Sequence, residues 1–434
     1  MSHIRHFRSV VFAAVLALAP LPGLLAQQPT KFDRDRLLIM LSVIRDDLQK
    51  NYFDSTYGGV DLAAAFDSAA DRVRKAGSNG EMLAALAQAL FELDDSHTSF
   101  APPRLSVKVD YGWDLAMVGD TGRVIVVRPG SDAEAQGLRR GDAVLALEGH
   151  ELNRQNLWRL KYAVASLAPR NVLHVSLLSG SGVRQLVLAA KVTPGREYQD
   201  FTTGDDFWRT VRLSQNLADS LASTYAELDG RVLYWKLPVF GDTRQIDDLL
   251  KRVRGHDALI LDLRDNPGGS IGTLTKLVGG LYADDVVIAS AHERSRILPI
   301  LAKGSGPRRF DGKLVVLINS GSASASELLA RTTQLTRRGT VIGDRSAGAV
   351  RESLIFAHQV GVEVVVPYAA SVSVADLVMP DGGTLEKVGV TPDEIILPGG
   401  EDLAAGRDPV LSRALALAGL TVSPEQAGAL LRHK

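Results

Sequence analysis

The sequence contains no cysteine among its 434 residues. This absence excludes disulfide bonds, thiol catalysis, and zinc or iron–sulfur sites with cysteine ligands. An excess of positive charge is also missing: 49 Lys and Arg against 50 Asp and Glu give a net charge of −1, which argues against a nucleic-acid binder working through bulk charge. Neither the GxGxxG pattern of dinucleotide sites nor the HExxH spacing of zinc peptidases occurs, so we expect no cofactor and no metal.

What is present fits a packed protein, with 45% hydrophobic and 23% charged residues. The N-terminus has a basic start at Arg5 and Arg8, followed by an apolar run at 10–18 that is shorter than the roughly 20 residues needed to span a bilayer. We therefore expect a secretory signal peptide over residues 1–26 and an exported protein, periplasmic or extracellular, without a transmembrane segment once the signal is removed. An uncleaved N-terminal anchor is the alternative.

Hydrophobic patterns divide the rest of the chain into four parts. Apolar residues at helical spacing, among them Leu37, Leu41 and Ile44, predict a helical domain over residues 33–103. Short β-type runs separated by Gly, Asp and Ser predict a β-rich domain over residues 107–192.

Strands then alternate with helices over residues 207–400. This alternation indicates a largely parallel sheet covered on both faces, and we assign the run VVIAS to this sheet as one of its strands. The runs LIFAHQV and EVVVPYA predict a hairpin within this part. Residues 401–434 predict a polar tail with one short amphipathic helix.

The strongest local signal is Ser324, where an apolar run enters a Gly/Ser cluster just before a helix. A hydroxyl nucleophile gains from this position, because small neighbours let a substrate approach and the helix start presents unpaired N–H groups to developing negative charge. A structural interpretation competes with it. Ser324 and Glu327 have the spacing of a capping box, and spacing alone favours the cap.

Two adjacent glycines, Gly268 and Gly269, follow a buried strand in ALILDLRDNPGGSIG. Such a turn can aim backbone N–H groups into a cleft, as an oxyanion hole requires. It can equally be a tight strand-to-helix turn.

A serine nucleophile needs a base, and histidine is the usual one. His97 ends the helical domain directly after Ser96, and Glu386 is a carboxylate that could orient an imidazole, as the third member of a triad does. Each also has a plain structural interpretation, as a surface or capping histidine and as an exposed glutamate beside Lys387.

Taken together and in this order, the segments resemble the tail-specific or C-terminal processing serine peptidases and the related core of tricorn protease. The resemblance rests on GSASASE at 321–327, LDLRDNPGG at 261–269, GVTPD at 389–393, and a β-rich domain that precedes the core. It implies an α/β fold: a crotonase-like protease core with an N-terminal helical domain and an inserted PDZ-like β-rich domain.

The resemblance implies that Ser324 is the nucleophile and that the N–H of Ala325, with one from Gly268 or Gly269, stabilises the oxyanion. One branch of these peptidases uses a lysine as the base, and this chain has Ala349 in its place, so that dyad is absent.

The tricorn-like branch uses histidine instead. There the resemblance implies that His97 is the base and that Glu386, acting through Ser96, holds the imidazole in the right tautomer for acyl transfer.

In the PDZ-like domain, the resemblance gives Tyr111, Gly112 and Trp113 as the loop that binds a peptide's terminal carboxylate. Tyr111 and Trp113 can instead be core aromatics of that domain.

We therefore expect an exported serine endopeptidase that cleaves peptides or C-terminal regions of proteins, with no nucleic-acid partner. A catalytically inactive peptide-binding protein on the same fold is the first alternative, because of Ala349. A hydrolase or lyase of the crotonase-like class that acts on small acyl compounds is the second.

Overall fold

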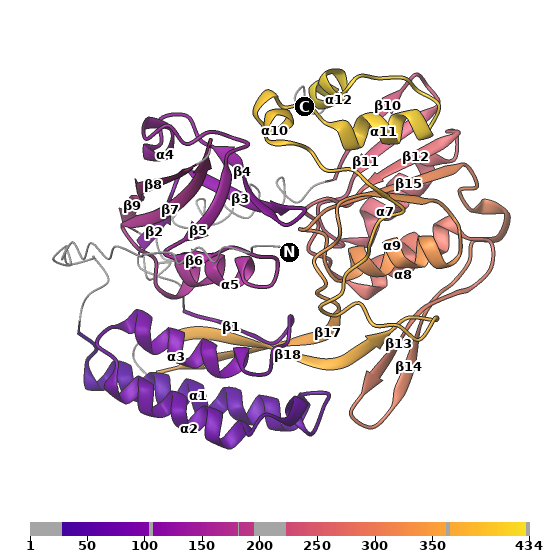
Figure 1. Cartoon of the computed structure of the whole chain (residues 1–434). Coiled ribbons are helices and arrows are strands. Elements are labelled where there is room, and N and C mark those ends of the chain that lie inside the picture. Colours follow the sequence, from indigo (N-terminus) through magenta and orange to yellow (C-terminus); the bar gives the residue numbers. More distant parts are fainter. Residues whose placement is uncertain (1–27, 104–106, 181, 195–222, 362–364, 431–434) are drawn as a thin grey trace, which may run out of the picture.

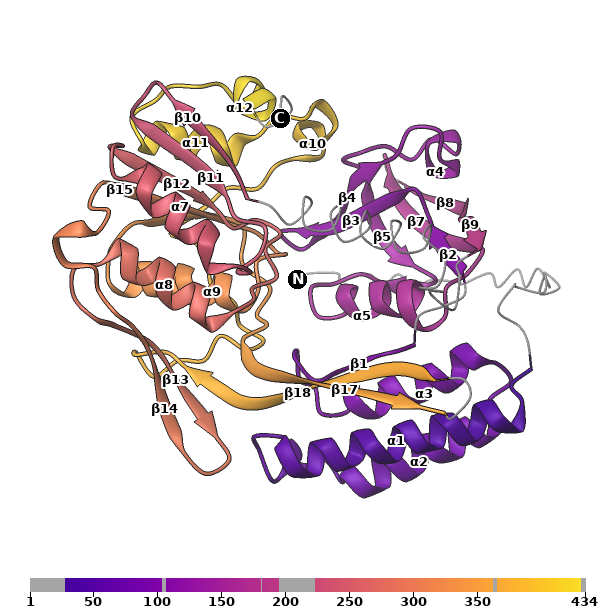
Figure 2. The ribbon, with the colours of Figure 1, turned by 180° about the vertical axis from the view of Figure 1, so that it is seen from behind.

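The computed structural model describes residues 28–103, 107–180, 182–194, 223–361 and 365–430. The expected signal peptide lies outside these residues. Figure 1 shows the β-rich domain above the helical layer and the α/β core on the other side of the molecule, and Figure 2 shows the same arrangement from behind. No helix of the described residues is long and apolar enough to cross a membrane.

The helical layer consists of α1 (Lys31–Asn51), α2 (Leu62–Lys75) and α3 (Asn79–Phe91), as the helical spacing predicts. Side-chain oxygens cap the start of each helix: Ser78, for example, accepts the N–H of Glu81. The buried faces of the three helices pack on one another and on the long strand β18 (Val366–Val378).

That strand belongs to an antiparallel five-stranded sheet that connects the helical layer with the core. The sheet has the order β1–β18–β13–β14, and β17 pairs with β18. The other four members are β1 (Ser99–Ala101), β13 (Val286–Glu293), β14 (Ile297–Ala302) and β17 (Arg351–Val360). The expected hairpin is thus confirmed as β17–β18, whereas β13, which contains VVIAS, was wrongly placed in the parallel sheet.

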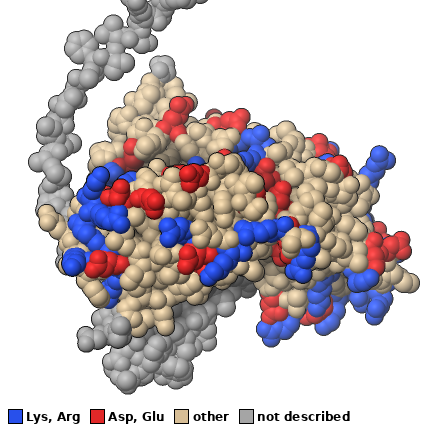
Figure 3. Space-filling view, turned by 90° about the horizontal axis from the view of Figure 1, so that it is seen from below, with Lys and Arg blue, Asp and Glu red and all other residues tan. Residues whose placement is uncertain are grey.

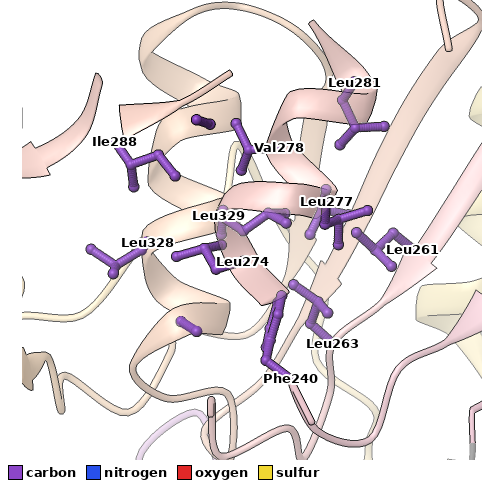
Figure 4. Close-up of a cluster of buried hydrophobic side chains, with 14 of the residues drawn as sticks. Phe240, Leu261, Leu263, Leu274, Leu277, Val278, Leu281, Ile288, Leu328 and Leu329 are labelled. Atoms are coloured by element: carbon purple, nitrogen blue, oxygen red, sulfur yellow. The ribbon is translucent and has the colours of Figure 1, made fainter. Parts of the chain in front are cut away.

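The core is a six-stranded sheet, parallel except for its first pair. In order, its strands are β10 (Thr224–Leu228), β11 (Val232–Lys236), β12 (Ala258–Asp262), β15 (Lys313–Ile318), β16 (Thr340–Gly343) and β19 (Glu394–Ile395). One face is covered by α7 (Thr243–Val253), α8 (Ile271–Leu281) and α9 (Ala325–Leu335). Figure 4 shows the cluster that results, in which Leu261, Leu274 and Leu329 come from a strand and two helices.

The other face of this sheet packs against the C-terminal helices α11 (Pro409–Leu417) and α12 (Pro424–Leu430), so the expectation of cover on both faces is confirmed. A further helix, α10 (Gly400–Ala405), precedes them. The expectation of one short helix after residue 401 was therefore wrong. Gly406, in the left-handed conformation, ends α10, and Pro409 and Pro424 are the first residues of α11 and α12, so the segment forms three helices.

The β-rich domain is a sheet of the order β3–β4–β5–β7–β8, with β6 on β5 and the separate pair β2–β9. Its members are β2 (Val107–Asp110), β3 (Trp113–Val118), β4 (Thr121–Val127), α4 (Asp132–Ala135), β5 (Ala143–Leu147), β6 (His150–Glu151), β7 (Val172–Ser179), β8 (Gly182–Ala189) and β9 (Lys191–Pro194). A helical segment that the sequence analysis did not predict, α5 (Leu157–Tyr162) with a π turn to Leu167, packs on this sheet.

The parallel strands place three loops at one edge of the core sheet, because the carboxyl ends of parallel strands lie on the same side. The loops follow β12, β15 and β16, and they carry Gly268, Ser324 and Ala349. On the face of the molecule seen in Figure 3, positive and negative side chains are interspersed, in keeping with the balanced charge.

Candidate active site

Ser324 lies between the end of β15 and the start of α9, in a backbone conformation that L residues rarely adopt (φ 55°, ψ −117°). Such strain costs about 1–3 kcal/mol and is found where a reactive side chain must be presented. The N–H of Glu327 donates to the carbonyl oxygen of Ser324 at 2.9 Å, and no side-chain hydrogen bond caps the helix there. Of the capping box that spacing alone favoured, the structure therefore shows the half in which Glu327 accepts the N–H of Ser324 at 3.0 Å, whereas the hydroxyl of Ser324 does not cap the helix.

The glycine turn packs directly against this serine. A Cβ atom built on Gly268 would lie 2.6 Å from Cβ of Ser324 and 3.1 Å from the nitrogen of Ala325. The N–H of Gly268 donates to Oδ1 of Asn266 at 2.8 Å. Within the described residues, no hydrogen bond engages the N–H of Ala325 or that of Gly269, so these two remain available to a developing oxyanion.

His97, Ser96 and Glu386 come together although the glutamate is 290 residues from the serine. Oγ of Ser96 lies 2.8 Å from Nδ1 of His97 and donates to Oε2 of Glu386, also at 2.8 Å. The N–H of Ser96 donates to Oε1 of the same carboxylate at 3.0 Å. Glu386 is 8% exposed, so its interpretation as an exposed loop residue is wrong.

These contacts determine the histidine tautomer. The Ser96 hydroxyl has one proton, and the carboxylate of Glu386 can only accept it. The oxygen of Ser96 must then accept a proton from Nδ1 of His97, which leaves Nε2 of the neutral ring as the base. Burial lowers the pKa of His97, and the nearby carboxylates of Glu386 and Asp95 oppose this effect only in part, so the neutral ring is favoured.

The loop after β16 connects the serine with the histidine group. The N–H groups of Gly348 and Ala349 donate to Glu327 at 2.8 and 3.0 Å, and the N–H of Val350 donates to Glu386 at 2.9 Å. The N–H of Ser324 donates to the carbonyl oxygen of Ala349 at 2.9 Å and to Glu327 at 3.0 Å. Two buried carboxylates thus hold successive amides of one loop, one on the side of the nucleophile and one on the side of the base.

In this structure no hydrogen bond joins the hydroxyl of Ser324 to the imidazole of His97, both of which are described residues. The two are linked through the backbone of Ala349 and Val350 and through Glu386. Catalytic hydrogen bonds are often long without substrate and shorten in the complex.

Three residues that the sequence analysis did not assign to the site are part of it. Glu327 is fully buried, and burial raises its pKa to about 7; the sequence signalled it only as a capping partner. Asp95 and Arg351 form an ion pair of 2.6 Å beside His97. Asp95 adjoins Ser96 in sequence, but nothing in the local pattern marks Arg351.

The predicted carboxylate-binding loop has a different set of contacts. Tyr111 and Trp113 pack against the core of the β-rich domain, which favours their interpretation as core aromatics. The N–H of Gly112 already donates to Oδ1 of Asp110 at 2.9 Å. Among the described residues, no group of three or more His, Asp or Glu side chains is arranged to hold a metal ion.

Comparisons with known proteins agree with a peptidase. Residues 231–396 match the model of peptidase family S41. The chain is 29% identical over 329 residues to the carboxyl-terminal-processing protease of Picosynechococcus sp., an alignment that covers 73% of this chain and 72% of that protein. It is 27% identical over 271 residues to the tail-specific protease of Haemophilus influenzae, covering 58% of this chain and 36% of that one.

Among solved structures, mature CPAF shares the fold, with a TM-score of 0.64 at 15% identity over 86% of this chain and 95% of that chain. This likeness concerns the mixed α/β fold alone. The sequence matches identify the protein as a serine peptidase that is similar to carboxyl-terminal-processing and tail-specific proteases.

Proposed function

We propose that the protein is an exported endopeptidase that cleaves peptides or C-terminal regions of proteins through an acyl-enzyme at Ser324, with His97 as the base. The observation that carries the proposal is the hydrogen-bonded series His97–Ser96–Glu386, which leaves Nε2 of the imidazole unprotonated. It corresponds to the tricorn-like branch. The methyl group of Ala349 supplies no amine, which supports histidine over lysine as the base.

In the proposed mechanism, Oγ of Ser324 attacks the scissile carbonyl carbon and passes its proton to Nε2 of His97. The negative charge on the carbonyl oxygen is stabilised by the N–H groups of Ala325 and Gly269, and the loss of one such donor costs roughly 3–4 kcal/mol in a comparable protease. The imidazolium then gives its proton to the leaving amine, and water repeats the sequence to release the acyl group. Glu386 stabilises the imidazolium through Ser96.

We further propose that the core is crotonase-like and that the β-rich domain, residues 107–192, is a PDZ-like module that selects substrates. Capture of a terminal carboxylate by the N–H of Gly112 requires Asp110 to give up that amide. A strand of the substrate would pair with β3, the outer strand of its sheet among the described residues.

A fluorophosphonate probe and a fluorogenic peptide test the proposal together. The wild-type protein is expected to be labelled at Ser324 and to cleave the peptide, and Ser324→Ala to lose both. Ser412→Ala is the matched control, because Ser412 lies on α11, on the opposite face of the core sheet, and its hydroxyl donates to the carbonyl oxygen of Val422. Unchanged cleavage by Ser324→Ala would overturn the proposal, and peptide binding without labelling would favour the inactive binding protein.

A further inference from the structure

Asp95 lies at the centre of the contacts that hold the His97 turn. Its side chain is fully buried. Oδ1 accepts the N–H groups of His97 and Thr98 at 2.8 and 3.0 Å and the hydroxyl of Ser373 at 2.8 Å. Oδ2 accepts Nη1 of Arg351 at 2.6 Å and the hydroxyl of Tyr52 at 3.0 Å. One carboxylate therefore shapes the turn that bears the base and also attaches it to the sheet below.

Arg351 is the cation of this group and lies among three carboxylates. Besides its contact with Asp95, its Nε is 3.7 Å from Oδ1 of Asp376 and 3.9 Å from Oε1 of Glu386. This Nε is buried and has no hydrogen-bond partner within the described residues. The guanidinium also stacks 4.6 Å from the centre of the Phe53 ring. Arg351 therefore acts on these carboxylates through its charge as well as through hydrogen bonds, because its Nε faces Asp376 and Glu386 at distances too long for a hydrogen bond.

We propose that Arg351 is a positioning residue of the peptidase, which anchors the His97 turn to the core through Asp95 and balances the negative charge that Asp95 and Glu386 place beside the imidazole. The inference rests on the proposed role of His97 as the base. Arg351 begins β17, directly after the loop that holds Ser324 and Glu386. The same residue therefore connects the helical layer with the loop on which the spacing of nucleophile and base depends.

The charged groups around the imidazole make this role measurable. Burial and the charge of Arg351 lower the pKa of His97, whereas Glu386 and Asp95 raise it. The other acidic residue of the turn, Asp94, points outward and is paired with Arg159 and Lys387. Without Arg351, two uncompensated carboxylates would favour the imidazolium, which cannot act as a base.

The test combines two variants with two measurements. Arg351→Met removes the charge and the tether, and Arg351→Gln removes the charge but keeps an amide that can still donate to Asp95. We expect kcat/KM for a fluorogenic peptide to fall about tenfold at pH 6 and less than about threefold at pH 8.5, since a higher pH restores the neutral ring. In a Ser324→Ala background, the NMR titration midpoint of the His97 ring should rise in both variants.

Arg338→Met is the control, because it removes another part-buried arginine whose donors go to the carbonyls of Leu281, Phe310 and Gly312 and to no carboxylate among the described residues. It should lower thermal stability without changing the shape of the pH profile. An equal loss of activity at all pH values together with an unchanged His97 midpoint would overturn the inference on Arg351 while leaving the proposed function intact. Peptide cleavage that survives Ser324→Ala would overturn the proposed function, whereas the NMR midpoint still tests Arg351.

Discussion

The carboxylate of Glu386 accepts both the hydroxyl and the N–H of Ser96, at 2.8 and 3.0 Å. The two contacts fix the rotation of the serine side chain as well as its position. Since the same oxygen of Ser96 faces Nδ1 of His97, the glutamate acts on the base through an intervening hydroxyl. The orientation of the imidazole therefore depends on two residues from distant parts of the chain.

Replacing Glu386 with Gln should lower kcat strongly. Three donors converge on this carboxylate, from the N–H and hydroxyl of Ser96 and the N–H of Val350, and an amide offers only one accepting atom. We expect a loss on the order of 10³-fold or more, as for the loss of the orienting carboxylate in a serine triad. Steady-state kinetics would show it as a fall in kcat with KM nearly unchanged.

Glu394→Gln is the matched control for this change. Glu394 pairs at the surface with Arg413 at 2.7 Å, so its replacement should leave kcat unchanged. If Glu386→Gln retained kcat within a few-fold of wild type, the indirect orientation of His97 would be contradicted.

The pH dependence of kcat/KM should reflect the buried state of His97. Burial lowers the pKa of this imidazole, and the base is active only in its neutral form. The acid limb of the profile should therefore lie below the ordinary histidine value of about 6.5, and activity should be nearly constant from about pH 7 to 8.5. A limb above about pH 7 would contradict the assignment of His97 as the base.

Much of the site was predictable from the sequence, for local reasons. Ser324 and the two glycines stand where strands end and helices begin, and parallel strands bring such ends together. The pairing of Glu386 with Ser96 followed only from the family resemblance. The role of Arg351 in the site could not be predicted, because its partners Asp95 and Asp376 come from different elements. The sequence around Arg351 indicates only a strand that begins with charged residues.

The errors have physical causes too. VVIAS has the apolar character of a buried strand, but pairing with β14 and β18 places it in the antiparallel sheet. The hydrophobic pattern of a strand predicts that it is buried, but it does not predict which strand it pairs with. The segment 157–167 was missed because α5 has only six residues, lacks a side-chain cap at its start and changes to a π turn.

Glu327→Gln should destabilise the protein and slow the reaction of Ser324. Four donors surround the carboxylate: the hydroxyl of Ser346 and the N–H groups of Ser324, Gly348 and Ala349. An amide leaves at least one of these N–H groups without an acceptor, at a cost of about 1–3 kcal/mol. Chemical denaturation should show this loss, and the rate of probe labelling at Ser324 should fall about tenfold or more.

Thr333→Val tests whether that loss is specific. Thr333 is buried on the same helix, and its hydroxyl donates to the carbonyl of Leu329, away from the loop that Glu327 holds. It should lower stability without slowing the labelling of Ser324. Equal labelling rates in Glu327→Gln and wild type would show that the carboxylate does not position the nucleophile.

Gly268→Ala should abolish activity by two effects, backbone strain and a steric clash with Ser324, and a control variant can separate them. Gly268 has a φ of 101°, and the added Cβ would lie 2.6 Å from Cβ of Ser324, closer than carbon atoms can approach. Gly230 has a φ of 62°, and a Cβ added there would meet nothing within 4 Å, so Gly230→Ala imposes backbone strain without contact. We expect Gly230→Ala to cost about 1 kcal/mol or more in unfolding free energy at full activity. Gly268→Ala should cost at least as much and lose probe labelling, because Ser324 and the N–H of Ala325 must move away from the added methyl group. Labelling at the wild-type rate would refute the close approach of this turn to the nucleophile.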